Sequence, residues 1–132
     1  MSAPDPTPGD TIRDVSGRHE LSTRWVPQGE GYDFDALVWR TRENDSWVER
    51  HVISRQDFET GSDRRRWISG LHSFDPLSGH AIMRVAEGDA PRDAPHVHYV
   101  YSWREWSVAE NRELRYICTC ETPFDHLPTG KA

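Results

Sequence analysis

The chain has 132 residues, enough for one domain, and its 16 basic and 22 acidic residues give a net charge of −6 at pH 7. Sequence-independent binding to DNA or RNA requires an excess of cations, so this balance argues against nucleic acid as a partner. Hydrophobic residues make up only 35 %, but the six Trp and four Tyr all lie between Trp25 and Tyr116. Because aromatic side chains bury large apolar areas, the core is expected in that part of the chain.

The two ends of the chain differ from its middle in composition. Residues 1–16 contain three prolines and few apolar side chains, which predicts a flexible N-terminal arm. Residues 122–132 contain two prolines and a glycine, and they are expected to form a loose C-terminal tail. The folded unit is therefore predicted to span residues 17–121.

The compartment is inferred from three features. The first residues lack the cationic start and apolar run of a signal peptide, and no apolar segment approaches the roughly 20 residues that span a bilayer. Cys118 and Cys120 are too close together for a normal disulfide framework, so both are expected to be free thiols. These features predict a cytoplasmic protein without a membrane partner.

Short runs of aromatic and β-branched residues alternate with polar residues and are separated by turn-forming residues. This pattern predicts an all-β, mainly antiparallel domain, either a small barrel or a sandwich of about seven strands. Ser54 is also suited to cap a single helical turn in the polar stretch after the third run. The seven expected strands are residues 19–26, 34–41, 47–53, 66–74, 80–86, 96–106 and 114–120.

The last two runs admit a helical alternative. Ser102 and Glu105 match the spacing of a helix capping box, but alternation over residues 96–104 favours a strand. A hairpin turning at residues 110–111 would place Tyr101 opposite Cys120, Trp103 opposite Cys118 and Glu105 opposite Tyr116. In that register the aromatic face would be buried and Arg104 would lie on the polar face.

Histidines are the first candidates for metal ligands. His96-Val97-His98 resembles the His-x-His of cupin barrels, in which alternate residues of one strand bind a metal. The next carboxylate is Glu105, seven residues after His98, whereas the cupin pattern has a Glu about four residues after it. The sequence therefore predicts no metal and no other cofactor, and His72, His80, His96 and His98 are the candidate ligands if a metal site were present.

The favoured functional hypothesis is a non-catalytic interaction module, since the nucleophile elbow and the glycine-rich phosphate loop are both missing. Clustered Arg beside Trp is typical of protein–protein hot spots. A protein partner is therefore expected on an exposed patch formed by Arg64, Arg65, Arg66, Trp67, Arg104 and Trp106.

The alternative hypothesis is a lipocalin-like or cupin-like barrel that binds a small molecule and uses barrel Tyr or His residues for any catalysis. Trp25 resembles the first-strand tryptophan of lipocalins, although Thr23 and Arg24 stand where that family has its Gly-x-Trp. Interior tyrosine hydroxyls need polar partners, which a bound ligand would supply. The expected pocket residues are Trp39, Tyr99, Tyr101, Trp103 and Tyr116.

Overall fold

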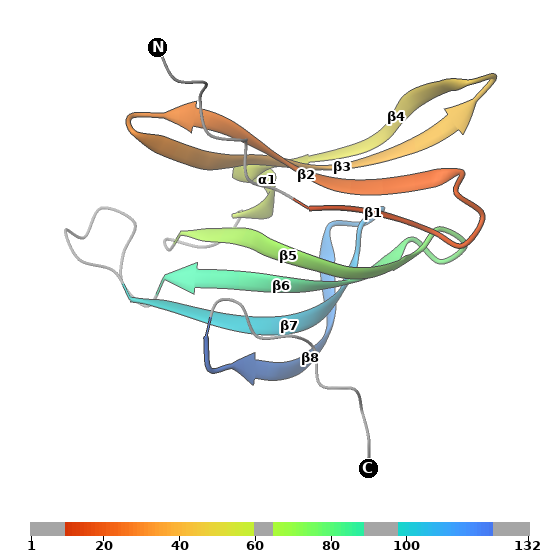
Figure 1. Cartoon of the computed structure of the whole chain (residues 1–132). Coiled ribbons are helices and arrows are strands. Elements are labelled where there is room, and N and C mark those ends of the chain that lie inside the picture. Colours follow the sequence, from red (N-terminus) through yellow and green to blue (C-terminus); the bar gives the residue numbers. More distant parts are fainter. Residues whose placement is uncertain (1–9, 60–64, 89–97, 123–132) are drawn as a thin grey trace.

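The computed structural model describes residues 10–59, 65–88 and 98–122 and is almost entirely antiparallel strand (Figure 1). The N-terminal sheet contains, in order, β1 (Thr11–Arg13), β2 (His19–Gln28), β3 (Gly31–Glu43) and β4 (Ser46–Ser54). The C-terminal sheet contains β5 (Arg66–Asp75), β6 (His80–Gly88), β7 (Tyr99–Ser107) and β8 (Arg112–Cys120).

Figure 1 shows the N-terminal sheet above the C-terminal sheet, with β1 and β5 at the edges that approach each other. Among the described strands no backbone pairing joins the two sheets, so the domain is a sandwich and not a closed barrel. The all-β expectation is therefore confirmed. Within the same residues, no helix has the length and apolar character that crossing a bilayer demands.

The seven expected strands are present wherever the structure describes them. The helical turn after the third is α1 (Arg55–Phe58), and the backbone N–H of Asp57 donates to Ser54 Oγ at 3.1 Å as the predicted cap requires. The strand β1 was not expected, because it lies inside the predicted flexible arm and pairs with residues 20–22. Residues 1–9 and 123–132, which hold most of the predicted arm and tail, lie outside the described residues.

The space between the sheets is filled mainly by aromatic side chains. Phe34, Trp39, Phe58, Phe74 and Trp106 are at most 9 % exposed and belong to one buried cluster with aliphatic neighbours. The ring of Phe58 links the layers, because its centroid lies 6.0 Å from that of Phe34 and 5.0 Å from that of Trp106. The aromatic content thus compensates for the low overall hydrophobic fraction.

The register of β7 against β8 agrees with the prediction for two pairs and differs for the third. Tyr101 pairs with Cys120 and Trp103 pairs with Cys118 as expected. A bulge after Trp103 then shifts the register, so Glu105 pairs with Arg115 and Tyr116 pairs with Arg104. An extra residue in one strand turns the side chains beyond it to the opposite face.

The orientation of β7 was predicted wrongly. Trp106 pairs with Ala81, which faces the N-terminal sheet, so the Trp106 ring is in the core and only 2 % exposed. Directly paired residues share a face, and therefore Arg104 also lies on the inner face. Tyr101 and Trp103, expected to face the core, occupy the outer face of the C-terminal sheet.

Candidate functional site

A pocket of about 410 Å³ lies at the seam where the end of β2 approaches the start of β5. We call it the seam pocket. Residues beside the β2–β3 turn and at the start of β5 line it, so both sheets contribute to it. Its lining residues are Trp25, Gln28, Gly31, Tyr32, Asp33, Arg55, Glu59, Arg65, Arg66, Trp67 and Tyr99.

Aromatic rings from both sheets form the apolar part of the seam pocket. Trp67 and Tyr99 contact each other edge to face, with centroids 4.5 Å apart and an interplanar angle of 72°. From the other sheet, Trp25 packs edge to face on Phe34 at 5.8 Å, and its indole N–H donates to Thr23 Oγ1 at 3.3 Å. Trp25 and Trp67 are half-buried, so each ring is anchored in the protein and also accessible from the pocket.

Two of the three arginines at the seam pocket are engaged by carboxylates. Arg55 contacts Asp33 at 2.9 Å and Glu59 at 3.7 Å, so both acidic side chains of the lining have the same arginine as a partner. Arg66 contacts Glu87 at 3.7 Å and lies 4.8 Å above the Phe58 ring. Burial lowers the pKa of Arg66, and this effect outweighs the attraction of Glu87.

Arg65 differs from the other two. It is exposed, and its Nη1 donates a hydrogen bond of 3.3 Å to the Tyr99 hydroxyl oxygen. Among the described residues no carboxylate lies within ion-pair distance of Arg65. The seam pocket therefore combines four aromatic side chains with one arginine, Arg65, that has no carboxylate partner among the described residues.

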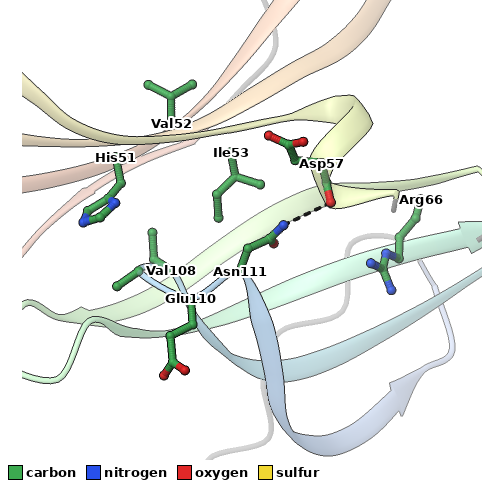
Figure 2. A pocket seen from close by; sticks show the side chains of 9 residues that line it. His51, Val52, Ile53, Asp57, Arg66, Val108, Glu110 and Asn111 are labelled. Carbon is green, nitrogen blue, oxygen red and sulfur yellow. Dashed lines mark hydrogen bonds between the residues drawn. The ribbon is translucent and has the colours of Figure 1, made fainter. Parts of the chain in front are cut away.

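A second pocket of about 370 Å³ lies between β4, α1 and the β7–β8 turn (Figure 2). Asn111, in the left-handed conformation at φ 52°, donates from Nδ2 to the Asp57 carbonyl at 3.0 Å. The same side chain accepts from Trp106 Nε1 at 3.2 Å, so it ties the hairpin to the helix and the core. In Figure 2 the Asp57 and Glu110 carboxylates point in different directions, and His51 is not directed at either.

The residues of the predicted interaction patch are not on one surface. Arg65, Arg66 and Trp67 line the seam pocket, whereas Trp106 is buried and cannot be an exposed anchor. Arg104 has a side chain only 14 % exposed and contacts Glu87 at 2.8 Å and Glu113 at 2.7 Å. Arg64 lies outside the described residues.

The residues of the predicted ligand pocket are also dispersed. Tyr99 lines the seam pocket, whereas Trp39 is in the core and Tyr116 is 49 % exposed. Trp103 is buried on the outer face, where its indole N–H is the one buried side-chain polar atom of the described residues without a partner. Burial raises the pKa of the Tyr101 hydroxyl on the same face, and nearby Tyr99 adds to the effect.

The candidate metal ligands lie apart from one another. The His72 ring contacts Trp103 edge to face at 6.0 Å, and His80 Nδ1 lies 3.5 Å from a Glu105 carboxylate oxygen. His98 is exposed, and His96 lies outside the described residues. Within the described ranges, no three His, Cys, Asp or Glu side chains gather as a metal site would require.

Sequence reasoning missed the part of the seam pocket that belongs to the N-terminal sheet. Tyr32 and Arg55 were not predicted as site residues, and Asp33 and Glu59 were interpreted as solvated loop carboxylates. Trp25 was the available signal for this half of the pocket. It lies in the part of β2 that the short β1 does not pair with, two residues before Pro27 and close to the β2–β3 turn.

Comparison of the chain with protein-family models, with curated proteins and with solved structures finds no match. The function is therefore argued from the geometry of the site alone.

Proposed function

We propose that this protein is a non-catalytic binding module and that the seam pocket is its binding site. One observation carries the proposal: Trp25 from one sheet and Trp67 and Tyr99 from the other line a single concavity together with Arg65. Aromatic side chains and arginine are the residues that contribute most at recognition sites, because they offer large rigid areas and directional donors.

The size of the pocket indicates the size of what it holds. Pockets for small molecules range over about 300–1,000 Å³, and the seam pocket, at about 410 Å³, falls in the lower part of that range. Its ligand is a compact organic group, presented by a free small molecule or by a side chain of a protein partner.

The charge arrangement supports binding over catalysis. Both carboxylates of the lining are held by Arg55, so neither is placed as an isolated acid or base. Cys118 and Cys120 lie two residues apart on β8, too close for a normal disulfide, and we include a cytoplasmic location in the proposal.

The test is a screen of an aromatic fragment library of neutral, anionic and cationic compounds, monitored through the indole N–H signals of ¹⁵N-labelled protein. Bound fragments are expected to move the signals of Trp25 and Trp67 and to leave those of Trp103 and Trp106 in place. The buried pair is the internal control for unfolding. A library without any such binder, or binders that move only the control signals, would overturn the proposal.

A further inference from the structure

We infer that the ligand of the seam pocket is an aromatic carboxylate, an inference that rests on the binding function proposed above. The aromatic ring of the ligand would contact Trp25 and Trp67, and its carboxylate would lie against Arg65 and the Tyr99 hydroxyl. The charge of the lining, the donors around Tyr99 and the exposure of the rings each support this assignment.

The charge of the lining favours an anion with a single negative charge. Three arginines and two carboxylates line the pocket, so the described lining carries one net positive charge. Arg55 contacts both of these carboxylates, and Arg66 contacts Glu87 outside the lining, so Arg65 is the lining arginine without a carboxylate partner among the described residues. A cationic ligand would meet the charge of Arg65 unfavourably, whereas a single carboxylate would pair with that arginine one to one.

The donors around Tyr99 fit a carboxylate. The Tyr99 oxygen accepts from Arg65 Nη1 at 3.3 Å, which leaves the Tyr99 hydroxyl proton with no acceptor among the described residues. The remaining N–H groups of Arg65 and the Tyr99 O–H can then donate to two oxygens of one planar anion. Arg65 also holds the Tyr99 oxygen in place, so the two donors are positioned before the ligand arrives.

The rings define the rest of the ligand. The Trp25 indole N–H is already bonded to Thr23 Oγ1, so this side chain offers its ring rather than a donor. Trp67 is held edge to face by Tyr99, which places the anion site directly beside an aromatic wall. An aromatic group packed against these rings adds burial and ring contacts to the charged interaction.

The inference is tested with three compounds that share an indole ring and differ in charge: N-acetyltryptophan, its neutral amide, and the cation tryptamine. The acid is expected to bind about tenfold more tightly than the amide, as a charged hydrogen bond would produce, and tryptamine is expected to bind weakest. The readout is the titration of the Trp25 and Trp67 indole signals.

Matched variants locate the effect. Arg65→Gln is expected to abolish the preference for acid over amide, and Tyr99→Phe is expected to reduce it. Arg18→Gln should leave the preference unchanged, since Arg18 is also exposed but lies in the β1–β2 turn, remote from the seam pocket. Unchanged Trp103 and Trp106 signals in each variant verify the fold.

The outcomes separate the two proposals. Equal binding of the acid and the amide, tightest binding of tryptamine, or a preference that survives Arg65→Gln would overturn the carboxylate assignment while leaving a binding module. The carboxylate assignment would also be overturned if the acid does not bind while fragments of other chemistry do, and the binding module would again remain. A fragment library in which no compound binds to the seam pocket would overturn both proposals.

A further binding experiment identifies whether the carboxylate belongs to a protein chain or to a free small molecule. A tetrapeptide ending in Trp with a free carboxylate would bind at least tenfold more tightly than N-acetyltryptophan if the ligand is a chain terminus of a protein. Equal or weaker binding of the peptide would assign the site to a free aromatic acid. In both cases amidation of the terminus is expected to weaken binding.

Discussion

The indole N–H of Trp39 donates a hydrogen bond of 3.2 Å to Nδ1 of His19, across the pairing of β2 with β3. Trp39 is only 3 % exposed, so this bond satisfies a donor that water reaches poorly. Nδ1 of His19 is the acceptor of this bond, and the Thr41 hydroxyl lies 3.3 Å from the same nitrogen.

Replacing His19 by Ala is expected to lower the free energy of unfolding by about 1–3 kcal/mol, because the Trp39 N–H would remain buried without its acceptor. Urea unfolding of His19→Ala, Trp39→Phe and the double variant measures the coupling between the two residues. Trp39→Phe removes the donor, so the histidine substitution should be less harmful in that background. Strict additivity of the two effects would show that the bond contributes nothing.

Trp106 is expected to behave as a core residue. Trp106→Ala should lower the free energy of unfolding by about 3–5 kcal/mol, since it leaves a cavity beside Phe58 and removes the donor to Asn111. The matched control is Tyr116→Ala on β8, where the side chain is 49 % exposed and a loss below about 1 kcal/mol is expected. Equal losses from the two substitutions, measured by chemical denaturation, would contradict the buried placement of Trp106.

Asp14, in the β1–β2 turn, is expected to make the free energy of unfolding depend on pH. Desolvation alone would raise its pKa, but hydrogen bonds from Ser16 and the backbone N–H of His19 outweigh this and hold the pKa below 3.8. A carboxyl whose pKa is lower in the folded state stabilises the protein above its unfolded-state pKa. That contribution is lost as the pH falls through the folded-state value.

Wild type is therefore expected to be more stable than Asp14→Asn at neutral pH, and the difference should shrink as the pH falls below about 4. Urea midpoints measured across this range provide the comparison. Ser16→Ala removes one donor to the carboxylate and should reduce the pH dependence without abolishing it. A constant difference between wild type and Asp14→Asn at all pH values would rule out this contribution.

The strands could be read from the sequence because alternation and turn residues are local signals. The turn between β3 and β4 is an example, since Asn44 and Asp45 adopt φ values of 50° and 68° that these residue types tolerate. The faces of β7 could not be read in this way. Both faces of the C-terminal sheet contain buried side chains, with Trp103 on one and Trp106 on the other, so alternation alone does not say which faces the second sheet.

The seam pocket could be predicted only in part. Arg65, Arg66 and Trp67 were identified because they are consecutive, and Tyr99 because it lies in an aromatic strand. Their proximity to Trp25 depends on how two sheets dock, which no local pattern encodes. The bulge after Trp103 is equally invisible in the sequence, because an inserted residue carries no compositional signal of its own.

Each sheet is a meander in which every described strand pairs only with its neighbours along the chain. Such pairings close short loops, so each half of the chain can form its sheet with little entropic penalty before the halves meet. Trp25 and Trp67 belong to different halves, and they become neighbours only when the finished sheets come together. The seam pocket is therefore formed by the docking of the two sheets, and neither sheet alone contains it.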